Sequence, residues 1–271
     1  MASRLLRSTG PKPVFLRKTG LGFVIGATVL LAACTTATPS QSPQISPTAL
    51  RPTSTAATPP PAQDVTVQGA QGFALRGTWR AAGPSSPAVL LLHMYRGSRV
   101  DWAPEAEVMR QAGIASLALD LRGHGDTRGE EDWELAVEDV AAAHAWIAQQ
   151  PEVDDRRRAT VGASIGANLA LTHAASDPHI RAVALLSPGM DYFGIKLEGV
   201  MSMYGERPIL LAASDKDTYS ADTVEVLAGE AMGPAILLVY PGSAHGTELL
   251  YRTQADFLPE LIRFLEDSLG P

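Results

Sequence analysis

From residue 64 onward, the hydrophobic positions fall into short runs separated by longer amphipathic stretches. The runs AVLLLH and IASLAL are continuously apolar, which is typical of strands buried on both faces of a sheet. The longer stretches carry apolar residues at helical spacing, and Pro151 ends one of them. We predict strands at residues 88–93, 114–119, 159–163, 182–186, 208–213 and 235–240, and helices at residues 102–111, 132–150, 165–175, 223–231 and 247–268.

Strands that alternate with helices predict a mainly parallel sheet with helices on both faces, an α/β fold. Ahead of the first buried strand, alternating apolar residues around Val67 and Leu75 predict a β-hairpin that turns near residues 69–72. Chemistry is expected at the carboxyl ends of the parallel strands, where open sheets of this kind form their sites. The expected domain spans residues 64–271, a normal size for one α/β domain.

Residues 1–33 have the pattern of a signal peptide. They contain five basic residues and no acids, and the bases precede an apolar run at residues 21–33 that is too short to span a bilayer comfortably. The run ends in Leu31-Ala32-Ala33-Cys34, which resembles a bacterial lipobox, the site where a signal peptide is cut before a cysteine that receives lipid. The alternative is an uncleaved anchor helix in which the cysteine has no role. We predict that Cys34 is lipidated.

A stalk and an acidic body follow the lipobox. Residues 35–63 are rich in Thr, Ser and Pro and contain one charge, so residues 34–63 are predicted to form a disordered stalk that starts at the lipidated cysteine. The formal net charge is −7, and subtracting the five leader bases leaves −12 on the rest of the chain. This charge argues against nucleic acid as a partner and against electrostatic docking on anionic lipid. We therefore expect a lipid anchor at the cell membrane, with the folded domain outside the cytoplasm.

One motif supplies a candidate nucleophile. Gly162-Ala163-Ser164-Ile165-Gly166 fits the G-x-S-x-G elbow and lies between a predicted strand and a predicted helix, which is the context that the motif requires. The glycines leave room for a sharp turn that lifts the Ser164 hydroxyl to a helix N-terminus, where N–H groups favour developing negative charge. The alternative is a glycine-rich packing turn. Because a serine hydroxyl is a weak nucleophile alone, the motif also predicts a histidine and a carboxylate beside it.

His245 is the predicted general base. It follows the last predicted strand in a loop, from which an imidazole can swing over the end of the sheet. The carboxylate should follow the strand at residues 208–213, where Ser214-Asp215-Lys216-Asp217 offers two candidates. Either Asp215 or Asp217 could accept the Nδ1–H of His245 and so hold its tautomer.

Backbone groups are expected to stabilise the oxyanion. One donor is the N–H of Ile165, directly after the nucleophile, and the other is the N–H of Met94, in the loop after the strand that ends at His93. Such a mechanism needs no metal and no organic cofactor, and we expect neither. Cys34 is the only cysteine, which excludes a disulfide or a cysteine zinc cluster within one chain.

From about Val65 to its end, the chain resembles the α/β-hydrolase superfamily. Besides the elbow, the resemblance rests on LLLH at residues 90–93 and DLRGHG at residues 120–125. The hairpin QGFALRG at residues 71–77 is similar to the opening of dienelactone-hydrolase-like and prolyl-peptidase-like members. The chain departs from the family at Met94, where many members have glycine, and it has a serine where dienelactone hydrolases proper have cysteine.

The resemblance implies an α/β-hydrolase fold and the chain order serine, acid, histidine. It also implies a G-x-x-D spacing after the strand at residues 208–213, with Ser214 at the glycine position, which selects Asp217 over Asp215. Arg122 and His124, in the DLRGHG loop, are expected to shape the site rather than to react.

The sequence thus predicts a serine hydrolase, most similar to a carboxylesterase (EC 3.1.1), that splits esters with small or short acyl groups. Rival predictions are a peptidase or amidase acting on short peptides, and a non-catalytic binding lipoprotein on a hydrolase frame. Only residues 188–207 remain to form a cap, which predicts an open site. The larger apolar side chains of the cap either line an acyl pocket or cover the sheet edge: Met190, Tyr192, Phe193, Met201, Met203 and Tyr204.

Overall fold

The computed structural model describes residues 14–15, 61–252 and 254–270. Cys34, most of the predicted stalk and all but two residues of the predicted signal peptide lie outside this described part. None of the helices in the described part is both long enough and apolar enough to cross a membrane.

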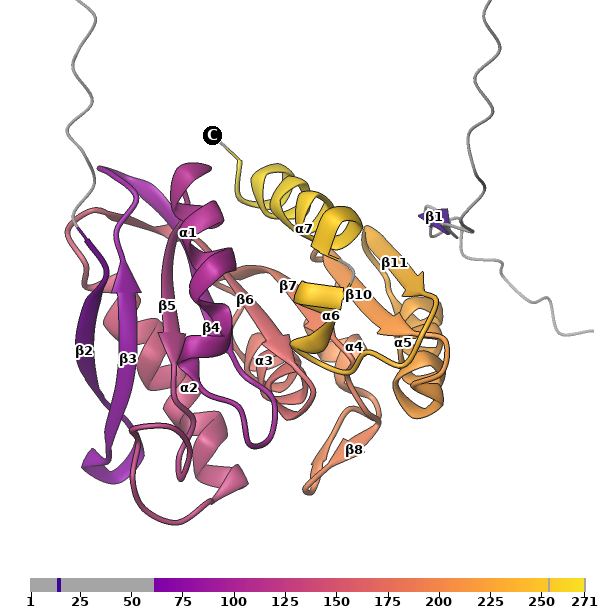
Figure 1. Cartoon of the computed structure of the whole chain (residues 1–271), viewed down its shortest axis with the longest axis horizontal. Helices are drawn as coiled ribbons and strands as arrows, with labels where there is room; N and C mark the ends of the chain where they lie inside the picture. The colour runs from indigo at the N-terminus through magenta and orange to yellow at the C-terminus, as the bar shows by residue number, and fades with distance from the viewer. Residues whose placement is uncertain (1–13, 16–60, 253, 271) are drawn as a thin grey trace, which may run out of the picture. The chain divides into compact units, whose positions relative to one another are not determined.

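A nine-stranded sheet organises the domain, in the order β1-β11-β10-β7-β6-β4-β5-β3-β2 (Figure 1). The strands β11, β10, β7, β6, β4 and β5, which are neighbours in this order, pair in parallel. At the other edge, β2 and β3 form the predicted antiparallel hairpin, and β3 is antiparallel to β5. The strands are β1 (Val14–Phe15), β2 (Gln63–Gln68), β3 (Ala74–Arg80), β4 (Ser86–Leu92), β5 (Ala115–Leu119), β6 (Val153–Ala163), β7 (Ile180–Leu186), β10 (Ile209–Ser214) and β11 (Ala235–Tyr240).

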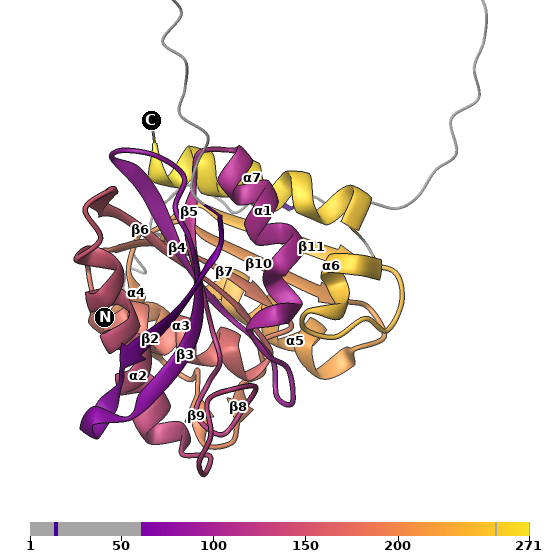
Figure 2. The same cartoon turned by 60° about the vertical axis from the view of Figure 1, so that its left-hand side comes forward.

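Helices cover both faces of the sheet (Figures 1 and 2). Side chains of α2, α3, α4 and α5 pack in one core, and side chains of α1, α6 and α7 pack in the other. Along β4, Leu90 and Leu92 face the first core while Val89 and Leu91 face the second, because successive side chains of a strand point to opposite faces. The helices are α1 (Ala103–Gln111), α2 (Trp133–Ala148), α3 (Ile165–Ser176), α4 (Val200–Tyr204), α5 (Thr218–Glu230), α6 (Glu248–Arg252) and α7 (Gln254–Leu269), with short 3₁₀ turns η1 (Ala70–Gly72) and η2 (Arg99–Trp102).

Most predicted elements agree with the structure to within two residues at each end, and three differ by more. Strand β6 begins at Val153 rather than at residue 159, because its first half is charged and gives no apolar run. Helix α5 begins at Thr218 rather than at residue 223, since its first turn is polar and lacks apolar periodicity. The single helix expected at residues 247–268 is two helices, α6 and α7.

Strand β2 begins at the edge of the sheet opposite to the carboxyl ends of the parallel strands. Strand β2 is antiparallel to β3, and β3 is antiparallel to β5. Two reversals give β2 the direction of the parallel strands, so its first residue, Gln63, lies toward their amino ends. A site at the carboxyl edge therefore faces away from the point where the predicted stalk joins the domain.

Two buried histidines stack where α2 and α3 meet. The rings of His144 and His173 lie 5.2 Å apart between centroids with an interplanar angle of 14°, and His144 Nε2 lies 2.8 Å from Thr160 Oγ1. Burial is the main cause that lowers the pKa of both rings, that of His144 well below its ordinary value of 6.5. Arg158 lowers both pKa values further, while Asp177 raises them. Both histidines are therefore neutral near pH 7.

This pair predicts a loss of stability in mild acid. Because the folded-state pKa lies below the unfolded value of about 6.5, the unfolded chain binds more protons, and the free energy of unfolding falls as pH drops below about 6.5. Replacing both histidines with glutamine should flatten this dependence in urea denaturation measured between about pH 5 and pH 8. His179→Gln is the matched control, because that side chain is 73% exposed. A double variant that keeps the wild-type slope would contradict the prediction.

Candidate active site

Ser164 occupies the tight turn between β6 and α3, as the G-x-S-x-G motif predicts. Its φ of 53° lies in a region that residues with side chains rarely adopt. A Cβ atom at Gly162 would lie 2.2 Å from the carbonyl oxygen of Gly166, and one at Gly166 would lie 2.6 Å from the carbonyl oxygens of Leu92 and His93. Both motif glycines are therefore required by close backbone contacts, and the turn places the Ser164 hydroxyl at the N-terminus of α3.

The side chain of His245 connects Ser164 with Asp217. His245 Nε2 lies 2.8 Å from Ser164 Oγ, and His245 Nδ1 lies 2.7 Å from Asp217 Oδ2. An ionised carboxylate only accepts hydrogen bonds, so Nδ1 carries the proton and Nε2 is left to accept the proton of the Ser164 hydroxyl. The three predicted residues follow three different strands, β6, β10 and β11, and meet at the carboxyl edge of the sheet.

Asp215, the alternative acid, has a different partner. Its Oδ1 accepts the backbone N–H of Gly242 at 2.8 Å, and Lys216 N–H donates to the Gly242 carbonyl oxygen at 2.9 Å. These bonds join the turn after β10 to the loop that carries His245. Of the two candidate carboxylates, the structure places Asp217 against His245 and Asp215 at the base of the loop.

The two predicted oxyanion donors flank this group. Ile165 is the first residue of α3, a position whose N–H has no acceptor within the helix. Met94 lies in the loop after β4, and its side chain contacts Gly246, where a Cβ atom would lie 2.9 Å from Met94 Sδ. The loop with Met94 is thus packed against the residue that follows His245.

His93 holds the loop that carries Met94. Its Nε2 accepts the N–H of Leu121 at 2.9 Å, so the ring proton lies on Nδ1, which donates to the Met94 carbonyl oxygen at 2.7 Å. Burial lowers the pKa of His93 to about 4, so the ring is neutral at pH 7 and keeps both bonds. His93 therefore fixes the loop without adding a positive charge to it.

Charged side chains hold the DLRGHG loop in place. Arg122 lies 4.1 Å over the ring centroid of Phe73, and its Nε and Nη2 donate to both carboxylate oxygens of Asp139 at 3.0 and 2.8 Å. Asp120 accepts the backbone N–H of Arg99 at 2.6 Å. The placement of Arg122 agrees with the supporting role expected for it. Sequence reasoning missed Asp139, although an acid on the inner side of an amphipathic helix is a usable signal.

The cap begins with a small hairpin, β8 (Asp191–Tyr192) and β9 (Ile195–Lys196), which precedes α4. Phe193 and Gly194 form its turn with positive φ values of 52° and 86°, the combination of a type I′ hairpin turn. Phe193 stacks on Trp133 at 4.9 Å between ring centroids and packs against Tyr95 at 5.0 Å, and His124 packs beside the same two rings. We call Tyr95, Trp133 and Phe193 the aromatic wall; it continues from the loop that carries Met94.

Asn168 connects this hairpin to α3, the helix that follows Ser164. It is fully buried on α3, where its Nδ2 donates to the carbonyl oxygens of Gly189 at 2.7 Å and Ile195 at 2.8 Å. Its Oδ1 accepts the N–H of Gly189 at 3.2 Å. Sequence reasoning missed Asn168, although an asparagine inside an otherwise apolar helix is a signal that could have found it.

The remaining cap residues differ in burial. Met201 and Tyr204 are buried in the core under the cap, whereas Met203 is 65% exposed. Tyr192 packs against His245, whereas Phe193 packs against Tyr95 and Trp133.

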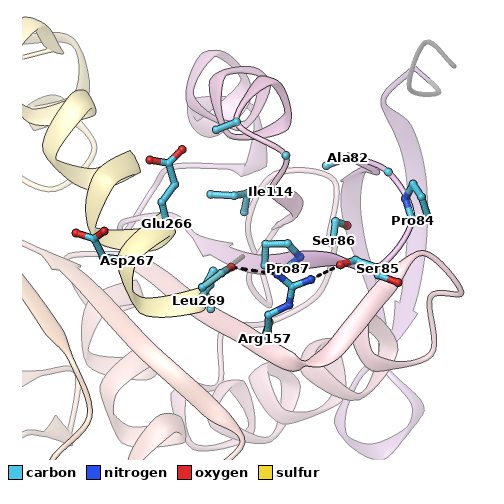
Figure 3. Close-up of a pocket in the computed structure, with 14 residues that line it drawn as sticks. Ala82, Pro84, Ser85, Ser86, Pro87, Ile114, Arg157, Glu266, Asp267 and Leu269 are labelled. Atoms are coloured by element: carbon cyan, nitrogen blue, oxygen red, sulfur yellow. Dashed lines mark hydrogen bonds between the residues drawn. The ribbon is translucent and has the colours of Figure 1, made fainter. Parts of the chain in front are cut away.

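A pocket of about 590 Å³ lies at the opposite, amino-end edge of the sheet (Figure 3). The loop between β3 and β4, the turn before β5 and the end of α7 line it together with Arg157. Arg157 already donates to the carbonyl oxygens of Gly270, at 3.1 Å, and Ser85. None of the predicted site residues lines this pocket. Within residues 61–252 and 254–270, no group of three or more His, Cys, Asp or Glu side chains is placed to hold a metal ion.

Comparisons of the sequence find related proteins over much of the domain. A family model described as serine aminopeptidase, S33, matches residues 83–204. A Mycobacterium tuberculosis protein, described only as uncharacterized, is 28% identical over 231 residues, which cover 77% of this chain and 81% of that protein. A thiohydrolase from Aspergillus aculeatus is 29% identical over 124 residues, 43% of this chain and 38% of that protein.

Solved structures agree in fold. A dienelactone hydrolase from Anabaena variabilis has a TM-score of 0.66 at 21% identity and covers 78% of this chain and 99% of its own. An esterase from Pyrococcus furiosus has a TM-score of 0.66 at 20% identity and covers 78% of this chain and 92% of its own. With the mostly parallel sheet, these likenesses show the α/β-hydrolase fold and confirm the predicted fold class. The family model, which matches less than half of the chain, agrees with this fold.

The contacts of Asn168 predict that its loss loosens the cap. Asn168→Leu keeps the volume but leaves the carbonyl oxygens of Gly189 and Ile195 without their donor, which should lower the free energy of unfolding by about 3 kcal/mol. Urea denaturation measures this loss, and limited proteolysis should cut the variant first within residues 188–197. A change below about 1 kcal/mol would contradict the clamping role.

Proposed function

We propose that the protein is a serine hydrolase that cleaves carboxylic esters with small or short acyl groups. The observation that carries this proposal is the unbroken series of hydrogen bonds from Asp217 through His245 to Ser164, at 2.7 and 2.8 Å, on a strained turn at the end of β6. A serine in this arrangement has the base and the oriented imidazole that it needs to become a nucleophile.

In the proposed reaction, Ser164 Oγ attacks the ester carbonyl carbon while His245 Nε2 takes the hydroxyl proton. The oxyanion accepts hydrogen bonds from the N–H groups of Ile165 and Met94. The bond to the alcohol oxygen then breaks, and His245 returns the proton to that oxygen, which leaves an acyl-enzyme. His245 next deprotonates a water molecule, which attacks the acyl carbon, and Ser164 Oγ recovers its proton as the acid departs.

The short cap and the aromatic wall support a compact apolar acyl group. The hairpin β8–β9 places Tyr192 beside His245, whose side chain is 36% exposed, and stacks Phe193 on Trp133. Tyr95 and Trp133 extend the apolar surface on the same side. The esterases among the solved relatives are consistent with this class of substrate.

Cleavage of short peptides or amides is the second candidate, favoured by the family model described as serine aminopeptidase. The same three side chains can attack an amide, but the leaving amine then needs a proton from His245 and a pocket that binds a peptide. A non-catalytic binding protein on this frame is the third candidate. It conflicts with the complete hydrogen-bond series, which a binding frame does not need.

Ser164→Ala should lower the rate of p-nitrophenyl acetate hydrolysis by on the order of 10³-fold or more, because no other group can form the acyl-enzyme. Circular dichroism should show the fold intact. A fluorophosphonate should label the wild-type protein at Ser164 and fail to label the variant. Hydrolysis at the wild-type rate in Ser164→Ala would refute the proposal, and an unlabelled wild type would favour the binding protein.

Asp217→Asn and Asp215→Asn form a matched pair. Asp217→Asn should cost on the order of 10⁴-fold in kcat, since the amide no longer holds the productive tautomer of His245. Asp215→Asn should keep most activity, because its carboxylate bonds only to the loop backbone.

Comparing p-nitrophenyl acetate and butyrate with peptide anilides separates the two enzymatic candidates: a higher kcat/KM for the anilides would favour the peptidase.

We also propose that the chain is held at a membrane by lipid on Cys34, with the catalytic domain outside the cytoplasm. The lipobox-like Leu31-Ala32-Ala33-Cys34 supports this anchor. Gln63 begins β2 toward the amino ends of the parallel strands, whereas Ser164 lies at their carboxyl ends.

Wild-type protein produced in a bacterium with lipoprotein processing should partition into the detergent phase of Triton X-114. Its intact mass should match a chain that starts at Cys34 and carries acyl groups. Cys34→Ala should lose the acyl mass, because the thiol that receives the lipid is gone. A wild-type mass that retains residues 1–33 would support the uncleaved helix instead and contradict the lipid anchor.

A further inference from the structure

The side chain of Met94 contacts the residue that follows His245, although the proposed reaction uses only the backbone N–H of Met94. A Cβ atom at Gly246 would lie 2.9 Å from Met94 Sδ, 3.2 Å from Met94 Cβ and 3.6 Å from Ala163 Cβ. Ala163 directly precedes Ser164. The Met94 side chain therefore lies where the neighbour of the proposed base meets the neighbour of the proposed nucleophile.

The backbone of Met94 is fixed on its own side of this contact. Its carbonyl oxygen accepts the Nδ1–H of His93 at 2.7 Å and the backbone N–H of Gly97 at 2.9 Å. His93 is buried and also accepts the N–H of Leu121 at 2.9 Å, which connects the Met94 loop to the DLRGHG loop. Because its main chain is held by these bonds, the thioether is a fixed support against which Gly246 packs.

The hydrogen bonds around His245 fix the shape of its loop more than the position of the loop beside the nucleophile. The Glu248 N–H donates to the His245 carbonyl oxygen at 3.0 Å, and the His245 N–H donates to Glu248 Oε2 at 3.3 Å. Both bonds join residues that are three apart in the chain. The base of the loop is joined to the turn after β10. The contact of Met94 with Gly246 is different, because it joins the histidine loop to the loop after β4.

This contact is part of one of the two cores. Ala244 and Leu249, which lie on either side of His245, are buried in the core that contains α1, α6 and α7, and Met94 packs against the same core. Gly246 has a φ of 56°, which a glycine adopts at little cost, and it has no side chain to displace the thioether. A long side chain at Met94 and none at Gly246 are therefore complementary in shape.

We propose that Met94 is a positioning residue, whose side chain packs against Gly246 and thereby keeps the His245 imidazole at the nucleophile. This inference rests on the proposed function, because it requires Ser164 and His245 to act together. Met94 then serves two parts of the proposed reaction: its N–H binds the oxyanion, and its thioether supports the residue beside the base.

The position of the imidazole matters at every proton transfer of the proposed reaction. His245 Nε2 takes the proton of Ser164 Oγ, which lies 2.8 Å away, and returns it to the leaving alcohol. It then takes a proton from water and returns it to Ser164 Oγ. Each transfer requires heavy atoms within about 2.6–3.2 Å of each other. A displacement of about 1 Å can cost on the order of 10²-fold in rate, so a contact that prevents smaller shifts is worth about tenfold.

The test replaces Met94 with alanine, which removes the thioether and keeps the backbone N–H. With p-nitrophenyl acetate, kcat should fall about tenfold while KM stays within about threefold of wild type. In proton NMR, the low-field resonance of the His245 Nδ1–H, which is bonded to Asp217, should broaden through faster exchange with water. Met94→Leu restores the volume and should return kcat to within about threefold of wild type. Met232→Ala, at a methionine that is 48% exposed before β11, should match wild type in kcat, KM and this resonance.

A second comparison separates support of the base from an effect on the oxyanion donor. In a His245→Ala background the base is absent, so Met94→Ala should leave the residual rate of hydrolysis unchanged within about twofold, because residues that act as a unit are not additive. A defect in the oxyanion donor would persist in this background. A further loss of rate there, on the scale of the loss in the wild-type background, would overturn the inference.

Gly246→Ala tests the same contact from the other side. The added methyl group would lie 2.9 Å from Met94 Sδ, so kcat should fall, and adding Met94→Ala should restore part of the loss. A double variant that is slower than both single variants would overturn the inference. Where circular dichroism shows Met94→Ala unfolded, Gly246→Ala alone decides, and an unchanged kcat in that variant would overturn the inference.

The remaining outcomes separate this inference from the proposed function. An unchanged kcat in Met94→Ala would overturn the inference, as would a lower urea midpoint with an unchanged His245 resonance, which indicates a structural role. Wild type that is not labelled by a fluorophosphonate at Ser164 would overturn the proposed function and this inference together. Labelled wild type with a fully active Met94→Ala overturns this inference alone.

Discussion

The backbone of Ser164 is held at a positive φ, and the rest of the site is arranged around that turn. Such a conformation costs about 1–3 kcal/mol and persists only where the surroundings fix it. Here Gly162 and Gly166 let three backbone segments approach more closely than any side chain would permit, and Ser164 N–H donates to the Leu186 carbonyl oxygen at 2.8 Å. The sheet holds Ser164 in this strained conformation, so the Ser164 hydroxyl has a fixed position that the side chain of His245 can reach.

Two different kinds of support hold the loops on the β4–β5 side of this turn. His93 is buried, neutral and bonded at both ring nitrogens, and it shapes the Met94 loop without a charge. Arg122 and Asp139 form a buried ion pair with two hydrogen bonds, and this pair carries the neighbouring DLRGHG loop. Asp217 lies at hydrogen-bonding distance from the His245 imidazole, whereas Asp139 is paired with Arg122.

The elements that could be predicted from the sequence are those with a local signature. Buried strands give apolar runs, and the elbow gives a five-residue motif, so the fold class and the position of Ser164 follow from short stretches of chain. The choice between Asp215 and Asp217 needed the family resemblance, because both follow β10 and their different partners, Gly242 for Asp215 and His245 for Asp217, come from a loop distant in sequence. Asn168 could not be assigned, since its partners Gly189 and Ile195 lie 21 and 27 residues away and depend on how a short cap folds back.

The start of α5 shows why a small error of boundary matters for chemistry. Sequence periodicity places the start at residue 223, after the polar first turn, but the helix begins at Thr218, directly after Asp217. Because of that earlier start, Ser220 is held in helical geometry and faces the cap, where its hydroxyl meets Tyr192. The first turn of α5 is polar and so gives no apolar periodicity, and Ser220 in that turn contacts Tyr192. One helix therefore carries a partner of His245, Asp217 at its N-cap, and a partner of Tyr192, Ser220 in its first turn.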